Sequence, residues 1–313
     1  MEYTIKKYEP ADFTQWNDLI AKSKNGTFLF HRDFMEYHSD RFEDLSLLVF
    51  EGHKLIAVFP ANRVGDEVYS HQGLTYGGLI LQGSIGVEKV ESIFGSIEDW
   101  FKAQRISLLY IKQVISIYHK EPANEMDYLL FKKGASLYRR DMNLAIDHSQ
   151  PSAISKSKMK NFRKHASAGF EIRQENDFSG FWDEVLIPRL DERHGVKPVH
   201  TKEEIQLLHS RFPDNILQYN IYHDGVLLAG ITLFHFGKVV KSQYGATTDS
   251  GEKMRAFDYL FIYLIQKYRD EVNYFDMGTV NEQQGKVFNR GLLKQKEELG
   301  CRVYSHDYYS LKL

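Results

Sequence analysis

Cysteine is nearly absent from this sequence, whose 313 residues include one, Cys301. A single cysteine excludes an internal disulfide and fits a reducing compartment. Cys301 follows Gly300, which ends a predicted helix. We therefore interpret it as a small buried residue that starts a strand rather than as a nucleophile.

Long apolar runs are missing as well. No apolar run approaches the roughly 20 residues that span a bilayer. Residues 1–6 show neither the basic nor the apolar region of a signal peptide. We therefore expect a cytoplasmic protein that does not insert into a membrane.

An excess of either charge is also absent. The 40 Lys and Arg residues nearly match the 42 Asp and Glu residues, which gives a formal net charge of −2. Such a chain has no global attraction for nucleic acid or for an anionic membrane, so any such contact must come from a local patch. We expect no DNA partner.

Several chemistries lack their motifs. The 13 histidines are scattered, without the spacing of zinc ligands. The sequence has no Gly-x-Ser-x-Gly elbow and no phosphate-binding loop that ends in Gly-Lys-Ser/Thr. We expect neither metal catalysis nor these hydrolase chemistries.

What the chain does contain is enough apolar material for two cores. Hydrophobic residues make up 42% of it and aromatic residues 14%, which is typical of a soluble globular protein. Its length suffices for two domains.

The two halves repeat one order of predicted elements. In each, two apolar runs flank a tight turn, at Glu51-Gly52 and at Asp224-Gly225. A glycine-containing loop, a helix, an apolar strand and a segment that ends in glycine follow. We place the helices near 87–104 and 255–269, and the strands near 108–111 and 274–277.

This repeat predicts an α/β protein with mixed sheets, built from two tandem copies of one unit. The alternative is an α/β protein in which the order arises by chance. Residues 147–152 are polar and include Pro151. We therefore expect domains at 1–150 and 151–313.

Basic residues crowd the segment that follows this boundary. Lys156, Lys158, Lys160, Arg163, Lys164 and His165 lie on a predicted helix whose apolar contacts are Met159 and Phe162. One interpretation is a clamp for phosphate or for a nucleic-acid backbone. The other is a solvated basic face.

The last third carries the most specific residues. An apolar strand from Tyr274 to Met277 ends at Gly278, and residues 291–300 read Gly-Leu-Leu-Lys-Gln-Lys-Glu-Glu-Leu-Gly. This segment resembles the Gly-Leu-Tyr-Arg-Phe-Lys-Lys-Gly-Phe-Gly segment of the FemAB family. The matching positions are Gly291, Leu292, Lys294, Lys296 and Gly300, whereas Gln295 and Leu299 replace aromatic residues.

The resemblance implies two tandem domains of the N-acetyltransferase (GNAT) fold. It also implies an acyltransferase that attaches an amino acid to an amine of a peptidoglycan precursor, with aminoacyl-tRNA as the acyl donor. The acceptor would be a small molecule or a peptide-bearing substrate. By its match to the family's lysine, Lys296 is expected to face the developing oxyanion; a solvent-facing lysine is the alternative.

Two further catalytic candidates follow from strand ends. Asp276 lies just before Gly278, where site residues gather in α/β units, and could accept a proton or hold the amine. Its alternative role is to cap the next segment. Tyr244 ends a central strand and could donate a hydrogen bond to substrate, or lie at the edge of the core.

The first half offers a predicted substrate surface. His71, Gln72, Tyr76 and Gly78 follow a strand, and the resemblance makes this a surface for a nucleotide-sugar peptide, with Arg63 as a phosphate partner. The alternative is a glycine-rich connection without a ligand.

The acyl donor is not fixed by the sequence. A GNAT enzyme that uses acetyl-CoA carries Gln/Arg-x-x-Gly-x-Gly/Ala before the helix that holds the pyrophosphate. Residues 245–255 lack this motif and include Asp249 and Glu252, although Lys253 and Arg255 offset that charge. We expect no tight acetyl-CoA binding, with Arg255 as the substrate-binding residue of this loop.

Two functions from different classes fit these observations. The first is an acyltransferase that uses aminoacyl-tRNA or, as an ordinary acetyltransferase, acyl-CoA. The second is a catalytically silent protein that binds a peptide or a nucleotide-sugar.

Overall fold

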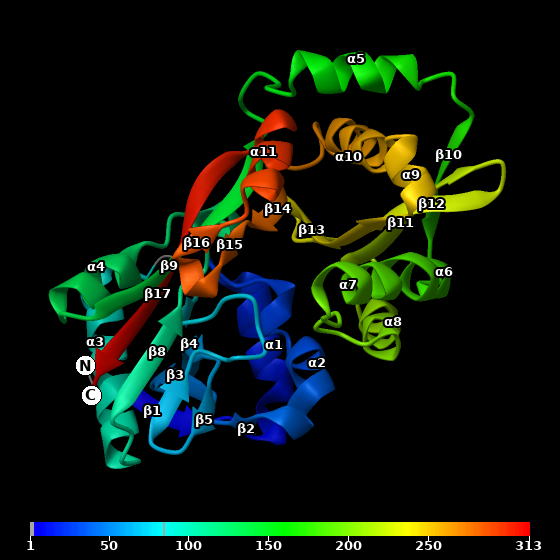
Figure 1. Ribbon diagram of the computed structural model, residues 1–313. Coiled ribbons are helices and arrows are strands. Elements are labelled where there is room, and N and C mark those ends of the chain that lie inside the picture. The colour runs from blue at the N-terminus through cyan, green and yellow to red at the C-terminus, as the bar shows by residue number, and fades with distance from the viewer. Residues whose placement is uncertain (1–2, 84) are drawn as a thin grey trace. The chain divides into compact units, whose positions relative to one another are not determined.

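The computed structural model describes residues 3–83 and 85–313 (Figure 1). Its contacts divide the chain into two compact units. Unit 1 comprises Met1–Met142, Gln283–Val287 and Tyr304–Leu313, and unit 2 comprises Asn143–Glu282 and Phe288–Val303. The domain boundary near Pro151 stays a prediction; in the compact units, the last strand of the chain is grouped with the N-terminal residues.

Unit 1 alternates short strands with helices. In chain order these are β1 (Tyr3–Lys7), α1 (Phe13–Lys22), α2 (Arg32–Met35), β2 (Glu43–Asp44), β3 (Leu47–Glu51), β4 (Lys54–Phe59), β5 (Asn62–Val64), β6 (Glu67–Tyr69), β7 (Ile80–Leu81), α3 (Val87–Ala103), β8 (Leu108–Lys112), α4 (Glu125–Lys132) and β9 (Ser136–Asp147). The expected helix at 87–104 and strand at 108–111 correspond to α3 and β8. Strand β9 begins in unit 1 and ends in unit 2.

A four-stranded sheet in the order β1-β3-β4-β7 holds the core of unit 1. Helix α3 is amphipathic, and its residues Val90, Phe94, Ile97 and Phe101 are fully buried in that core at helical spacing. Strands β5, β6 and β8 lie in a second sheet, where β8 also pairs with the C-terminal strand β17 (Arg302–Lys312). The pairing with β17 is antiparallel and runs from Tyr308 opposite Lys112 to Lys312 opposite Leu108.

Unit 2 has longer strands. Its elements are α5 (Lys156–Lys164), β10 (Phe170–Glu175), α6 (Ser179–Phe181), α7 (Ile187–His194), α8 (Lys202–Arg211), β11 (Ile216–His223), β12 (Val226–His235), β13 (Val239–Thr247), α9 (Asp249–Lys253), α10 (Ala256–Lys267), β14 (Tyr274–Thr279), β15 (Asn281–Glu282), β16 (Val287–Phe288) and α11 (Arg290–Glu298). Of these, β16 begins in unit 1 and ends in unit 2. The short segment Trp182–Leu186 before α7 is a π-helix.

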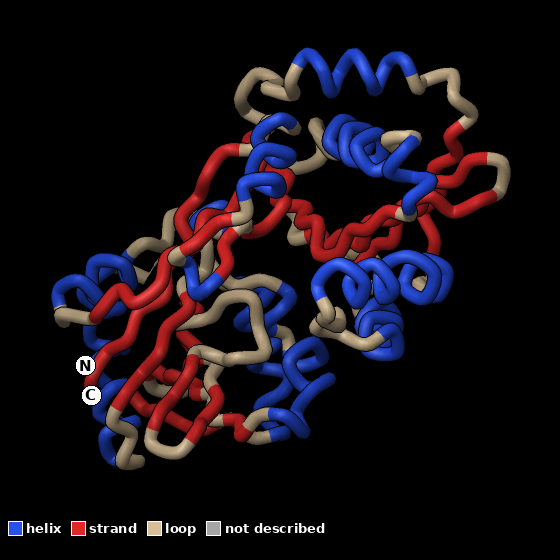
Figure 2. The backbone as a smooth tube through the Cα atoms, in the orientation of Figure 1, coloured by secondary structure: helices blue, strands red, loops and turns tan. Residues whose placement is uncertain are grey.

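The strands of unit 2 follow the order β10-β11-β12-β13-β14-β9, with α10 on one face and α6 to α8 on the other (Figures 1 and 2). The β11–β12 hairpin turns at Asp224 and Gly225, which both have positive φ as a tight two-residue turn requires. Helix α10 buries Leu260, Phe261 and Leu264 against the sheet. The α/β class predicted from the sequence is confirmed.

Each unit contains a parallel pair of strands with a helix between them in the sequence. In unit 1, β6 pairs with β8, with Val68 opposite Leu109. In unit 2, β13 pairs with β14, with Val240 opposite Phe275. The parallel pairing of β13 ends at Lys241 and Asp276, while β13 continues beside β12 as far as Thr247. The two strands therefore stop pairing partway along β13.

Among residues 3–83 and 85–313, no helix combines the length and the apolar composition that a membrane span requires.

Candidate functional site

A pocket of about 440 Å³ lies in unit 2 beside the half of β13 that pairs with β12 but not with β14. Helices α7, α9, α10, α11 and the inner side of α5 contribute to its wall. The lining residues are Lys158, Arg189, Leu190, Arg193, Gly245, Ala246, Thr247, Gly251, Glu252, Arg255, Phe257, Asp258, Leu292 and Gln295. The wall thus combines four cationic side chains with two carboxylates.

The loop between β13 and α10 is folded into the short helix α9. Thr248 caps α9, because its Oγ1 accepts a 3.0 Å hydrogen bond from Gly251 N. Five backbone amides of this loop donate within the chain, at 2.9–3.1 Å: those of Thr248, Gly251, Glu252, Met254 and Arg255. These amides are therefore not free to bind the phosphates of a ligand.

Gly251 is required here for packing. A Cβ at this position would lie 2.3 Å from the Leu228 carbonyl oxygen of β12 and 2.5 Å from Thr247 Oγ1. The glycine lets α9 rest directly on β12, which is a different reason from close approach to a pyrophosphate.

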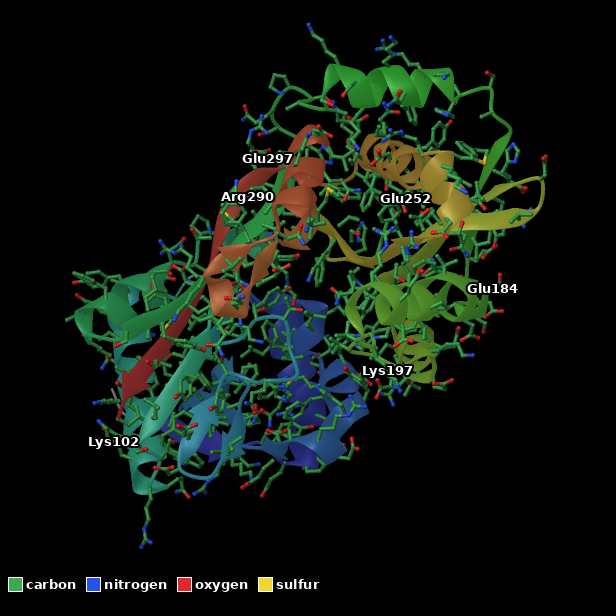
Figure 3. All side chains as sticks on the ribbon, in the orientation of Figure 1. Lys102, Glu184, Lys197, Glu252, Arg290 and Glu297 are labelled. Carbon is green, nitrogen blue, oxygen red and sulfur yellow. The ribbon has the colours of Figure 1, made fainter. Side chains whose placement is uncertain are left out.

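Ion pairs join α7 to α9 at this pocket. Arg189 donates to Asp249 Oδ1 at 2.8 Å and to Glu252 Oε2 at 2.6 Å, and Arg193 donates to Glu252 Oε2 at 2.6 Å. Figure 3 labels Glu252 on α9. The carboxylates that the sequence analysis expected to repel a pyrophosphate are thus neutralised by arginines from α7, which the sequence did not assign to a site.

Arg255 and Lys158 border the same pocket. Arg255 caps α10 in the left-handed conformation, at φ 57°, and its side chain is exposed. Lys158 reaches from α5 to Asp258 on α10, at 2.5 Å. The binding role expected of Arg255 stays a prediction, and its position on the pocket wall is compatible with it.

Lys296 is buried rather than solvent-facing, with 5% of its surface exposed. It lies on α11, whose first turn is capped by Asn289, and its Nζ donates to the carbonyl oxygens of Gly278 at 3.1 Å and Thr279 at 2.9 Å. Burial lowers the pKa of Lys296 to about 8, although the Asp276 carboxylate opposes this shift. The same helix supplies Leu292 and Gln295 to the pocket wall.

Asp276 is completely buried at the end of the parallel pairing. Its Oδ1 accepts hydrogen bonds from Asn143 Nδ2 at 2.8 Å and from Gly278 N at 2.7 Å. Lys241 lies opposite it on β13, and burial lowers the pKa of Lys241 while the Asp276 carboxylate raises it. Two lysines and one carboxylate therefore share the region where β13 and β14 separate.

Tyr244 lies on the half of β13 that does not pair with β14. Its hydroxyl group contacts His200, 2.6 Å from Nδ1 and 3.3 Å from the backbone nitrogen, and its ring packs edge-on against Trp182. Burial raises the pKa of Tyr244 to about 12. Its hydroxyl is engaged by His200, and its catalytic role stays a prediction.

The first-half candidates lie inside or at the edge of unit 1. His71, Tyr76 and Gly78 are buried; Tyr76 is fully buried and donates to Thr27 Oγ1 at 3.2 Å. Gln72 is exposed and bonds with Asn62.

Arg63 donates to the Gly65 carbonyl oxygen at 2.6 Å. These residues are distributed between the core and the surface of unit 1, and their substrate-binding role stays a prediction.

Sequence reasoning missed Lys241 and Asn143, and it did not assign Arg189 to a site. A lysine directly after two buried valines, Val239 and Val240, is a signal that could have identified Lys241. No local signal marks Asn143 or Arg189, because their partners lie 133 and 60 positions away along the chain. Among the residues that the structure describes, no three His, Cys, Asp or Glu side chains come together as a metal site.

Comparisons with known proteins agree with this fold. Residues 154–284 match the acetyltransferase (GNAT) domain family. No curated protein matches the sequence. Several solved structures share the fold over nearly the whole chain at low sequence identity.

The crystal structure of FemX has a TM-score of 0.73 at 12% identity, and the match covers 100% of this chain and 98% of that one. The structure of L-PGS from Bacillus licheniformis has a TM-score of 0.61 at 12% identity, covering 98% and 92%. A tandem GNAT protein from the clavulanic acid biosynthesis pathway has a TM-score of 0.55 at 11% identity, covering 99% and 98%.

The chain is therefore a GNAT-fold protein, and the GNAT domain in its second half places it among the acyltransferases. Along its full length it has the FemAB-like tandem GNAT fold that the FemX structure shares. The resemblance seen in residues 291–300 is thus confirmed at the level of the fold.

Proposed function

We propose that unit 2 transfers an acyl group to an amine at the pocket beside β13. The observation that carries this proposal is the buried Lys296, which lies beside Asp276 where β13 and β14 stop pairing, on the helix that also forms part of the pocket wall. A lysine that the fold holds away from solvent, in a domain of acyltransferase type, points to a role in transfer.

In the proposed step, the nitrogen of the acceptor amine attacks the acyl carbon, and a C–N bond forms as the bond to the donor's leaving oxygen or sulfur breaks. Negative charge develops on the acyl oxygen in between. The Lys296 ammonium would stabilise that charge. The proton released by the amine goes to the leaving group, either directly or through Asp276.

For the donor we favour an aminoacyl ester of RNA over acyl-CoA. Five amides of the loop before α10 are bonded within the chain, and Gly251 packs on β12. A CoA pyrophosphate would therefore lack the free amides that such a group normally binds. The resemblance of residues 291–300 to the FemAB family supports an amine of a peptide-bearing cell-envelope precursor as the acceptor.

The test is incubation with aminoacyl-tRNA or acetyl-CoA and amine acceptors, with mass spectrometry of the products. Lys296→Met should lower transfer by about 10- to 100-fold, which corresponds to the roughly 1.5–3 kcal/mol of a hydrogen bond to a charged group. Lys294→Met on the same helix is the matched control, because Lys294 is 77% exposed. Equal transfer by the wild type and Lys296→Met would refute the assignment.

The pH profile separates two roles for Lys296. If its ammonium stabilises the oxyanion, transfer falls as the pH rises through about 8, where the group loses its proton. If the neutral amine were the base, transfer would instead rise to that pH. We expect the first profile.

A catalytically silent binding protein is the second candidate. It is favoured by the ion pairs of Arg189 with Asp249 and Glu252, which already satisfy the charged groups on one side of the pocket. Ligand binding without any transferred product, for every donor tried, would support it.

A further inference from the structure

The outer face of α5 presents a row of cations. Lys156, Lys160, Arg163 and Lys164 are exposed, and their spacing at i, i+4, i+7 and i+8 places them on one side of the helix. Within residues 3–83 and 85–313, none of the four forms an ion pair with a carboxylate. Nitrogen-tipped side chains extend from this helix away from α10 in Figure 3.

The opposite face fixes the orientation of α5. Lys158 bonds to Asp258 of α10 at 2.5 Å and lies 3.8 Å from Glu298. The ring of Phe162 stacks on Tyr259 of α10, with the ring centroids 4.5 Å apart. Lys158 lies two positions after Lys156, and Phe162 lies two positions after Lys160. Because both face the inner side of the helix, the four cations are held outward.

The chemistry of this face fits a regular polyanion. The four cations span about 12 Å at a rise of 1.5 Å per residue. A nucleic-acid duplex presents roughly seven phosphate charges over that length, at one per 1.7 Å. A helix that enters a bilayer carries apolar side chains on the face toward the lipid, whereas Phe162 faces α10 here.

We propose that the outer face of α5 binds the phosphate backbone of RNA. Lys158 lines the pocket of unit 2 from the opposite face of the same helix, so an RNA held on the outer face of α5 is about one helix diameter, roughly 10 Å, from the place where an acyl group would be bound. This proposal deepens the proposed function, because α5 would hold the RNA that carries the acyl group. Only that biological role of the RNA rests on the proposed function. Binding is measured without transfer, so the two proposals can fail separately.

The test measures the affinity of the full chain for a fluorescein-labelled RNA hairpin by fluorescence anisotropy at several salt concentrations. The α5 variant combines Lys156→Gln, Lys160→Gln, Arg163→Gln and Lys164→Gln. The charge-matched control combines Lys7→Gln, Lys22→Gln, Lys197→Gln and Lys312→Gln, four exposed positions that form no ion pair with any residue the structure describes. Circular dichroism checks that both variants are folded.

We expect the α5 variant to bind RNA at least about tenfold more weakly and the control less than about twofold more weakly. The slope of log affinity against log salt should shrink in the α5 variant by about 0.7–0.9 for each phosphate that the helix no longer neutralises. Equal weakening in both variants, no RNA binding by the wild type, or binding to phosphatidylserine vesicles in preference to RNA would each overturn the proposal.

Discussion

At the residue scale, Lys296 shows how burial changes the chemistry of an ordinary side chain. Its neighbour Lys294, two positions away on α11, is 77% exposed, and Lys296 is 5% exposed. The fold surrounds Lys296 with carbonyl oxygens and leaves Asp276 as the nearby counter-charge. Sequence alone could match Lys296 to a family position, but burial depends on the ends of β14 and α11 meeting, which a sequence pattern does not encode.

This burial predicts a pH dependence of stability. The pKa of Lys296 is about 8 in the folded chain against an ordinary value of 10.5, so between these values the unfolded state binds more protons. Stability therefore rises with pH across this window. Relative to Lys296→Met, the wild type should gain up to about 3 kcal/mol between pH 7 and pH 10.5, at 1.36 kcal/mol per pKa unit.

Urea unfolding of both proteins at several pH values measures this difference. Lys294→Met, whose side chain is exposed, should follow the wild type at every pH. Parallel curves for the wild type and Lys296→Met would show that the Lys296 ammonium is not destabilised by burial.

At the scale of elements, the spacing of apolar residues predicted the longer helices. The turn expected at Asp224-Gly225 joins β11 to β12, and α3 and α10 lie within a few residues of their expected bounds. Helix α9 was not predicted, because five residues show no periodic pattern. Its arginine partners on α7 lie about 60 positions away, so no window of sequence could contain the pair.

Gly251 gives a direct test of how α9 packs. Gly251→Ala should cost about 1–3 kcal/mol of stability, because the added methyl group meets the backbone oxygen of Leu228. Gly180→Ala in α6 is the matched control, since a Cβ there meets no atom within 4 Å. Thermal unfolding measures both, and an unchanged melting temperature for Gly251→Ala would mean that α9 can shift away from β12.

The same element predicts weak binding of acetyl-CoA. With the amides of Thr248, Gly251, Glu252, Met254 and Arg255 bonded within the chain, we expect a Kd above about 100 μM, or a binding free energy weaker than about −5.5 kcal/mol. Isothermal titration calorimetry measures it. Micromolar affinity that disappears in Arg255→Ala would instead identify an ordinary CoA-dependent acetyltransferase.

At the scale of the whole molecule, the path of the chain decides which residues complete each unit. Pairing across β8 brings residues 308–312 into unit 1, where Leu311 is buried in the core. A polar linker near Pro151 marked the repeat in the sequence, but nothing local to residues 302–313 indicates which half they complete. Strand partners so far apart are set by tertiary packing, which no local pattern of residues encodes, and the domain limits at 1–150 and 151–313 stay a prediction.

Removing residues 304–313 should therefore destabilise unit 1, whose first segment ends at Met142, about 160 positions before Tyr304. Deletion exposes one edge of β8 and removes Leu311 from the core. Hydrogen exchange of the deleted chain should show reduced protection in β8 and α3, with protection retained in α10 and β12. Equal reduction in both units, or none, would contradict the division of the chain into these units.

The return of β17 also sets an order of events during protein synthesis. Every residue of unit 2 leaves the ribosome before residue 304, whereas unit 1 still waits for its last strand. Domains usually complete folding from the N-terminus as they are made. In this protein the unit that begins first is finished last, so from the synthesis of β8 to that of β17, unit 1 exposes the strand edge that β17 will cover.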